Sequence, residues 1–312
     1  MTQIKPLEGM MTPRFADIAT FFRLPIIKDL SKLDYCICGV PWDGGTTNRP
    51  GARHGPREIR NSSSLVRLYH PRSLKSPYDT FNVADIGDCP VNPADLQDSL
   101  LKIENFYNKI LQSKTIPISI GGDHLVSLPV LRALAKNKPV GLFQFDSHTD
   151  TYDTYFGGFK YTHGTPFRRA IEENLIDPEK YVMLGIRGSL YHPDDLNWAR
   201  EQGVTIITID DFHEMGFNKV IDIIYKVLGD VSTYLTFDID GIDCTYAPGT
   251  GTPEVGGFTV RESQIIIRAL NKINFIGADV VEVSPPFDIN NMTSHIGATI
   301  AFEILCTMTK TN

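Results

Sequence analysis

Four short motifs in this chain combine acidic residues with histidine or follow an apolar run, and residues of these types could hold metal ions. The motifs are Gly121-Gly122-Asp123-His124, Asp146-Ser147-His148-Thr149-Asp150, Asp238-Ile239-Asp240 and Glu282-Val283-Ser284-Pro285. In extended backbone, alternate side chains point to the same side, so the polar groups within a motif should converge. Without a cation, several carboxylates in one place would repel one another. The motifs therefore predict a metal site.

The candidate ligands are four carboxylates and two imidazoles: His124, Asp146, His148, Asp150, Asp238 and Asp240. Oxygen donors with some nitrogen, and no thiolate cage, favour Mn²⁺ or a similar cation over structural zinc. Six ligands exceed the needs of one open catalytic ion, whereas two ions that share a bridging carboxylate fit the set. Such a pair lowers the pKa of a bridging water and supplies hydroxide near neutral pH. A dinuclear hydrolytic centre is the interpretation.

Each motif alone has a plainer interpretation. An isolated Asp-x-Asp at the end of a strand is more often a cap or an ion-pair partner, and two glycines after a strand usually mark a turn. The metal interpretation rests on the presence of all three ligand-bearing motifs at strand ends in one chain.

The elements that would position these motifs are apolar runs rich in β-branched residues. Continuous apolar strands separated by helix-length segments are typical of a parallel sheet covered on both faces. The expected strands are Tyr35–Val40, Thr115–Ile120, Val140–Phe145, Tyr181–Ile186, Val204–Ile209, Thr233–Ile239 and Ile276–Val283. The expected helices are Asp95–Gln112, Leu128–Ala135, Asp194–Glu201, Asn218–Leu228 and Arg261–Ile273. Ligands of such sheets bind beyond the carboxyl ends of the strands, which is where the four motifs would lie.

The bulk composition is that of an ordinary globular protein. The chain has 312 residues, 42% of them hydrophobic, and shows no internal repeat or linker, so we expect a single domain over 1–312. A net charge of -7 and the absence of a Lys/Arg cluster argue against nucleic-acid binding. Five cysteines without a C-x-x-C pair suggest reduced thiols. No apolar stretch could span a membrane, so a cytoplasmic location is expected.

With these motifs in place, the chain resembles the ureohydrolase family: arginases, agmatinases and related amidinohydrolases. The resemblance also covers Pro41–Gly45, Gly51–Pro56, Thr236–Gly257 and Val280–Asp288. It implies an α/β fold, a three-layer α/β/α sandwich with a mainly parallel central sheet. It further implies hydrolysis of a guanidino group to urea and an amine at two Mn²⁺ ions per subunit, with Ni²⁺ as the alternative metal. Family members are commonly homo-oligomers, and neither trimer nor hexamer is favoured by this sequence.

The resemblance also implies roles for individual residues. One ion would be held by His124, Asp146, Asp150 and Asp238. The other would be held by Asp146, His148, Asp238 and Asp240, with Asp146 and Asp238 bridging.

Three residues are expected in catalysis: Glu282, His163 and Asp150. Glu282 would pair with the substrate guanidinium, for which a planar cation and a bidentate carboxylate are well matched. His163 would protonate the leaving amine, because an amine anion is a very poor leaving group and histidine titrates in a suitable range. On spacing alone, Glu282 could instead be a structural ion-pair partner and His163 a turn residue.

The substrate is less narrowly defined by the residues. The segment Tyr152–Tyr161 resembles guanidinobutyrase and guanidinopropionase types, so the favoured substrate is a guanidino acid such as 4-guanidinobutanoate or 3-guanidinopropanoate. Tyr155 and Phe156 are the candidate residues of the pocket wall, with packing or an interface as the alternative. Lys160 or Arg187 could receive the carboxylate of such an acid. Agmatine would instead need a carboxylate such as Asp153, and guanidine itself would suit a pocket closed by bulky aromatic residues.

Two positions depart from the family pattern. Ser147 replaces the usual alanine between the first aspartate and the histidine, and we expect its side chain to point away from the ligands. Cys244 stands where proline usually follows Asp243, which removes a restraint on the loop. Two rival classes are an inactive regulatory relative, which would have lost ligands, and a mononuclear deacetylase, which would not need all six.

Overall fold

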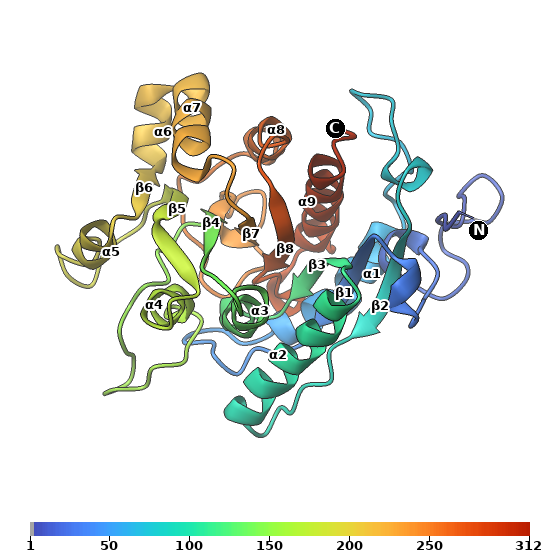
Figure 1. Ribbon diagram of the computed structural model, residues 1–312. Helices are drawn as coiled ribbons and strands as arrows, with labels where there is room; N and C mark the ends of the chain where they lie inside the picture. The colour runs from blue at the N-terminus through green and yellow to red at the C-terminus, as the bar shows by residue number, and fades with distance from the viewer. Residues whose placement is uncertain (1–2) are drawn as a thin grey trace.

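The protein, a computed structural model that describes residues 3–312, is built on a parallel β-sheet. Eight strands in this range lie in the order β2-β1-β3-β8-β7-β4-β5-β6 (Figure 1), and every neighbouring pair is parallel. The strands are β1 (Tyr35–Val40), β2 (Val83–Asp88), β3 (Ile116–Gly121), β4 (Val140–Phe145), β5 (Ile176–Ile186), β6 (Thr205–Thr208), β7 (Thr233–Asp238) and β8 (Phe275–Val281).

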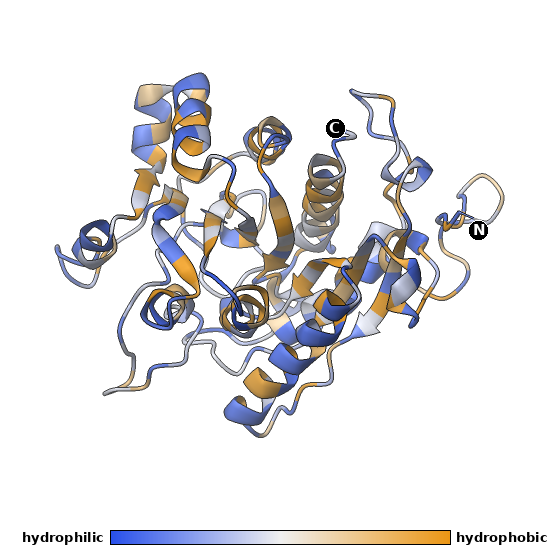
Figure 2. Ribbon diagram, in the orientation of Figure 1, coloured by the Kyte–Doolittle hydropathy of each residue, from blue (hydrophilic) through white to orange (hydrophobic). Residues whose placement is uncertain are grey.

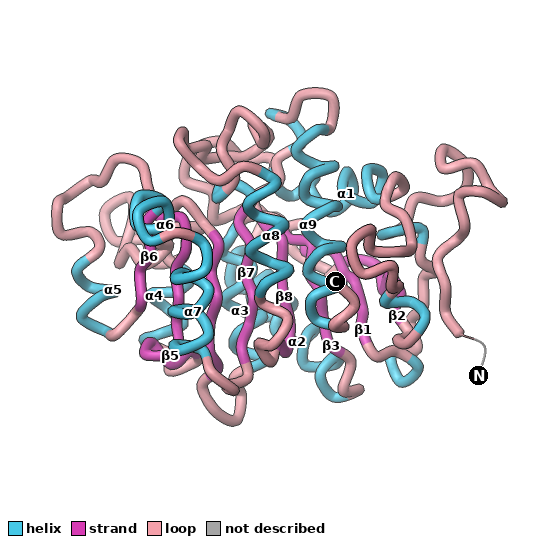
Figure 3. Tube along the Cα trace, turned by 90° about the horizontal axis from the view of Figure 1, so that it is seen from above, coloured by secondary structure: helices cyan, strands magenta, loops and turns pink. Residues whose placement is uncertain are grey.

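Helices cover both faces of the sheet, as the view from above shows (Figure 3). One layer contains α1 (Gly55–Ser63), α6 (Ile209–Met215), α7 (Phe217–Leu228), α8 (Val260–Ala269) and α9 (Met292–Met308). The other contains α2 (Leu96–Gln112), α3 (Ser127–Leu134), α4 (Pro166–Glu172) and α5 (Asn197–Gln202). The predicted three-layer α/β/α arrangement is confirmed. None of the described helices is both long enough and apolar enough to cross a bilayer.

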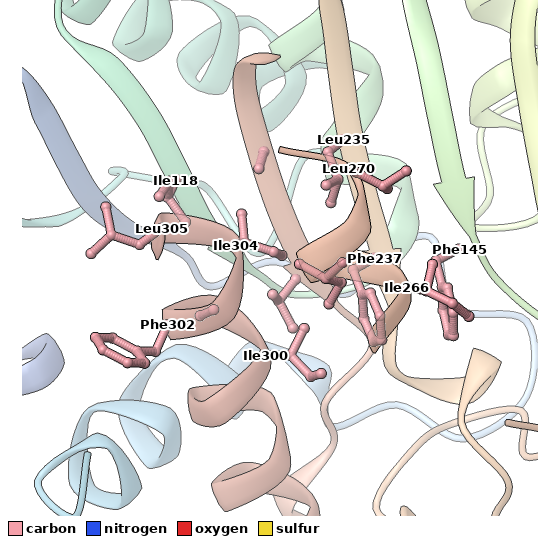
Figure 4. Close-up of a cluster of buried hydrophobic side chains, with 14 of the residues drawn as sticks. Ile118, Phe145, Leu235, Phe237, Ile266, Leu270, Ile300, Phe302, Ile304 and Leu305 are labelled. Carbon is pink, nitrogen blue, oxygen red and sulfur yellow. The ribbon is translucent and has the colours of Figure 1, made fainter. Parts of the chain in front are cut away.

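Two hydrophobic cores, one on each side of the sheet, hold the layers together. Successive strand residues alternate between them, as Phe143 and Phe145 of β4 do against Val140 and Leu142. The ribbon coloured by hydropathy shows the apolar colour concentrated on the strands and on the inner sides of the helices (Figure 2). Figure 4 shows the first core, where α8 and α9 pack against β7.

The sequence pattern located seven strands and missed β2, α1, α4, α6 and α9. The edge strand β2 mixes polar with apolar residues and has no continuous apolar run. Helix α9 has the opposite property. Most of its residues from Thr293 to Thr307 are buried, so it lacks the polar face from which helical periodicity is recognised.

The order of the strands explains how the motifs meet. The four motifs follow β3, β4, β7 and β8, and these four strands are the adjacent central ones, in the order β3-β8-β7-β4. Parallel strands bring all their carboxyl ends to one edge of the sheet. Three of the motifs then enter short 3₁₀ turns, at His124–Val126, Ile239–Gly241 and Pro285–Phe287.

We predict that Phe145→Ala lowers the free energy of unfolding by about 3–5 kcal/mol, because it leaves a cavity beneath the candidate site. The Phe145 ring is fully buried and stacks on Phe237 with centroids 4.3 Å apart. Denaturant titration would measure the loss. The matched control is Phe15→Ala, since Phe15 is 94% exposed and its change should stay within about 0.5 kcal/mol. Equal effects of the two substitutions would contradict the assigned core.

Candidate active site

The six predicted ligands lie together at the carboxyl edge of the central strands. Their donor atoms form two groups, each with all donors within 4.8 Å of one another: His124, Asp146, Asp150 and Asp238 in the first, and Asp146, His148 and Asp240 in the second. All are buried except His148, which is half-buried. Asp146 belongs to both groups and so joins them.

The first group surrounds one nitrogen of His124. Its Nδ1 lies 3.2 Å from Asp146 Oδ2, 2.9 Å from Asp150 Oδ2 and 3.1 Å from Asp238 Oδ2. Despite these distances, Nδ1 has no partner in hydrogen-bond geometry among the described residues and is fully buried. One nitrogen and three oxygens that converge without hydrogen bonds fit a cation coordinated between them.

A chain of hydrogen bonds orients the lone pair of His124. Thr236 Oγ1 donates its one proton to the buried carboxylate of Asp279, at 2.6 Å. The same hydroxyl oxygen therefore accepts a hydrogen bond from His124 Nε2, at 2.7 Å. With its proton on Nε2, the ring presents the lone pair of Nδ1 to the three carboxylates. Asp279 is held in place by Ser127 and Tyr234, which donate to its other oxygen at 2.6 and 2.8 Å.

Asp146 is placed as a bridge between the two groups. Its Oδ2 faces His124, whereas its Oδ1 accepts the backbone N–H of His148 at 2.7 Å and lies 3.7 Å from His148 Nδ1. Gln144 Nε2 donates to Oδ2 at 2.6 Å, and Tyr181 in turn donates to Gln144 Oε1. The carboxylate is thus fixed from behind while both oxygens face the site.

Asp238 does not join the second group in this arrangement. Its Oδ2 faces His124, and its Oδ1 accepts the backbone N–H of Asp240 at 2.8 Å. A second bridging role for Asp238 stays a prediction.

The structure overturns the expectation that Ser147 points away from the ligands. Ser147 is fully buried and its hydroxyl donates to Asp240 Oδ1 at 2.6 Å, with His148 Nδ1 3.1 Å away. The other oxygen, Asp240 Oδ2, lies 3.1 Å from His148 Nδ1. The side chains of Asp146, Ser147 and His148 do not alternate between two faces as they would in a strand, because β4 ends at Phe145 and the chain bends immediately afterwards. Ser147 therefore occupies Asp240 Oδ1, whereas Oδ2 faces His148 and accepts only a longer hydrogen bond, from Thr252 Oγ1 at 3.3 Å.

Mutual repulsion is visible in the ionisation of the acids. Burial raises the pKa of Asp146 to about 7, and the charges of Asp150 and Asp240 add to the effect. Burial alone would lower the pKa of His124 and His148, but the surrounding carboxylates raise both well above 6.5. Protons thus take the place that cations would occupy, and the donor set fits two divalent ions.

His163 and Glu282 form a buried pair beside the ligands. His163 Nδ1 lies 2.8 Å from Glu282 Oε1, and this oxygen also accepts the backbone N–H of His124 at 2.8 Å. Although burial opposes it, the charge of Glu282 raises the pKa of His163 to about 9. His163 Nε2 lies 2.7 Å from Thr47 Oγ1 and 3.1 Å from the backbone nitrogen of Thr47.

Glu282, the acidic member of this pair, is more deeply buried than His163. It is 1% exposed and does not line the cavity described below, although its Oε2 makes no hydrogen bond within residues 3–312. Its φ of 63° and the φ of 52° at Asp150 are left-handed values, which non-glycine residues adopt at a cost. Contact between Glu282 and the substrate stays a prediction.

A cavity of about 500 Å³ opens onto the two groups of ligands. Its wall includes Asp150, Asp238, Asp240, His148 and His163. It also includes Thr47, Arg49, Tyr152, Tyr155, Tyr191 and Glu254.

Several residues proposed for the substrate tail lie elsewhere. Phe156 is 74% exposed and outside the wall, and Lys160 is exposed and outside it as well. Asp153 is also outside it and is bound by Arg169 at 2.8 Å. Arg187 donates to six backbone carbonyls, five in the segment after β7 and one at Gly185 of β5, so its guanidinium holds that segment in place. Only Tyr155 of the predicted tail residues lines the cavity.

Sequence reasoning missed Thr47, Arg49, Thr236 and Asp279. Thr236 and Asp279 lie inside apolar strands, where a lone polar residue is itself a signal because an unpaired buried polar group is costly. Thr47 and Arg49 lie in a loop between two resemblance segments and carry no periodic pattern.

We predict that Ser147→Ala weakens binding of the second cation by about 10- to 100-fold, because Asp240 loses the donor that orients it. Titration of the metal-free protein with Mn²⁺, followed by calorimetry, would resolve the two ions, and the first should be unaffected. Ser263→Ala is the control, since this hydroxyl is equally buried but bonds Thr259 within α8. Two ions bound with unchanged affinity would contradict the role of Ser147.

The fold agrees with comparisons to known proteins. The model of the Arginase family matches residues 33–307. The chain is 54% identical to a guanidinopropionase and 43% identical to a guanidinobutyrase, both of Pseudomonas aeruginosa. These matches cover 97% of the chain and 95% and 96% of the two relatives. Proclavaminate amidinohydrolase of Streptomyces clavuligerus superposes with a TM-score of 0.92 at 38% identity, over 96% of this chain and 100% of that one. The chain therefore belongs to the arginase family and is a hydrolase of guanidino carbon–nitrogen bonds.

Proposed function

We propose that this protein hydrolyses a short guanidino acid, 3-guanidinopropanoate or 4-guanidinobutanoate, to urea and the corresponding amino acid. The observation that carries the proposal is the 54% identity to a guanidinopropionase over 97% of the chain. The cavity supports it, since three tyrosines and Arg49 are among the residues that line it. Guanidine itself would leave most of the 500 Å³ empty of substrate.

The proposed ions are two Mn²⁺, with Ni²⁺ as the alternative, because the donors are mainly carboxylate oxygens with two imidazole nitrogens. When bound, two such ions supply an activated water near neutral pH and stabilise the negative charge that develops on the substrate. The first group of ligands would hold one ion through His124, and the second would hold the other through His148. Asp146 would contact both.

The protein's own contribution to bond cleavage is the delivery of a proton. His163 lines the cavity, and Glu282 holds its Nδ1, so Nε2 is the nitrogen turned toward Thr47 and the cavity. A pKa of about 9 keeps the ring protonated at neutral pH, which is the state that a proton donor needs. Glu282 in this proposal orients His163 and stabilises its positive charge, in the way that a buried carboxylate does for a catalytic histidine.

Agmatine is the second candidate substrate, and one observation favours it. Glu254 lines the cavity, with its carboxylate 3.9 Å from His148 Nε2, and could receive a distal ammonium group. A chicken agmatinase is 41% identical over 97% of the chain. The substrate panel below separates the two.

We predict that the Mn²⁺-loaded protein releases urea from 3-guanidinopropanoate and 4-guanidinobutanoate with kcat/KM at least about tenfold above agmatine, which corresponds to about 1.4 kcal/mol of discrimination. Urea release would be measured for these three compounds, arginine and guanidine, with Mn²⁺ and with Ni²⁺. A preference for agmatine would reject the guanidino-acid proposal. The absence of urea from every compound with either metal would reject the hydrolase role.

We predict that His163→Gln lowers kcat by about 10²- to 10⁴-fold, because the leaving amine loses its proton donor. The wild-type rate should fall as the pH rises through about 9, where His163 loses its proton. The residual activity of the variant should lack this alkaline limb. Steady-state rates from pH 6 to 10 measure both effects, and thermal unfolding checks that the variant is folded. A variant that keeps the same alkaline limb would contradict the role of His163.

A further inference from the structure

We propose that Arg49 binds the carboxylate of the substrate tail and so determines the preference for guanidino acids. The inference rests on the proposed function, and it concerns the binding of the substrate tail.

The guanidinium of Arg49 is already held in one orientation. Its Nε donates to the carbonyl of Gly251 at 3.1 Å and its Nη2 to that of Thr250 at 2.8 Å. Its plane also stacks on the ring of Phe287, with Cζ 4.3 Å from the centroid. Little side-chain entropy remains to be lost on binding, which favours recognition by a preorganised group.

These contacts leave part of the guanidinium free. Arginine has five N–H donors, and only one on Nε and one on Nη2 are used here. The two donors of Nη1 and the second donor of Nη2 have no acceptor within residues 3–312. Nη1 and Nη2 together form an edge that matches the two oxygens of a carboxylate.

The charge of the cavity wall supports an anion at this place. Arg49 is the one lysine or arginine among the residues that line the cavity within residues 3–312. The acids Asp150, Asp238 and Asp240, with His148, belong to the proposed ion sites, and His163 is paired with Glu282; besides Arg49, the remaining charged side chain of the wall is Glu254. A carboxylate tail therefore finds one permanent cation, and it avoids Glu254 by turning toward Arg49.

Arg49 is also connected to the reacting end of the cavity. A Cβ at Gly251 would lie 3.0 Å from the carbonyl oxygen of Arg49 and 3.8 Å from Glu282 Oε2. The loop that anchors Arg49 thus adjoins the carboxylate that pairs with His163.

The test compares an acid with its uncharged analogue. Arg49→Met keeps the length and packing of the side chain but removes the charge and the donors. For 3-guanidinopropanoate we expect kcat/KM to fall by about 10- to 100-fold, mostly through KM, because one hydrogen-bonded charge pair is lost. For 3-guanidinopropanamide, whose tail is neutral, we expect a change of less than about twofold. Arg49→Lys should lie between wild type and Arg49→Met on the acid and match wild type on the amide.

Other outcomes would overturn the inference. Equal losses on acid and amide, in the Lys variant as in the Met variant, would mean that Arg49 only supports the loop of Thr250 and Gly251. Unchanged kinetics on the acid would mean that the carboxylate binds elsewhere. The proposed function fails in a different way, since the wild type itself would then release no urea from the acid.

Discussion

The constraint on which this structure depends is the convergence of four carboxylates and two imidazoles in a space largely closed to water. Six ionisable groups at such distances cannot all keep their ordinary charges, and the raised pKa of Asp146 and of both histidines shows how protons relieve the repulsion when no cation does. Divalent cations relieve it more completely, because each neutralises two charges at the point where the donors meet. The sheet makes the convergence possible, since the four motif-bearing strands are its four adjacent central strands.

Around these donors, a set of hydrogen bonds decides which atom of each ligand faces the site. Asp279 acts on His124 through Thr236, Tyr181 acts on Asp146 through Gln144, and Ser147 acts directly on Asp240. These contacts fix the tautomer of His124, the position of the Asp146 carboxylate and one oxygen of Asp240, so that lone pairs are oriented before a ligand binds. The left-handed φ values at Asp150 and Glu282 are a further sign of preorganisation, because the surrounding contacts hold the backbone in a conformation that is unfavourable for non-glycine residues.

How much of this could be predicted from the sequence depends on where a residue lies. The convergence of the six candidate ligands could be predicted because their motifs follow apolar strands, and the ends of parallel strands meet by geometry. Ser147 could not be placed, since the period of two ends with the strand at Phe145. Helix α9 and strand β2 lacked the periodic or continuous apolar pattern on which prediction depends. Glu282 was expected beside the substrate, which stays a prediction. Its contact with His163 depends on the approach of distant loops, which spacing does not encode.

The substrate tail poses a harder problem for the same reason. Its surroundings come from loops at Thr47–Arg49, Tyr152–Tyr155, Ser189–Tyr191 and Thr252–Glu254, none of which is ordered by a repeating pattern. Charge alone pointed to Asp153, Lys160 and Arg187, and none of them lines the cavity. Asp153 is paired with Arg169, Lys160 is exposed, and the guanidinium of Arg187 donates to six backbone carbonyls. Strand ends thus carry the candidate metal ligands, whereas loops form the rest of the cavity wall. Loops tolerate substitutions and insertions without disturbing the sheet, so relatives that share the same metal site can differ in the substrate tail that they accept.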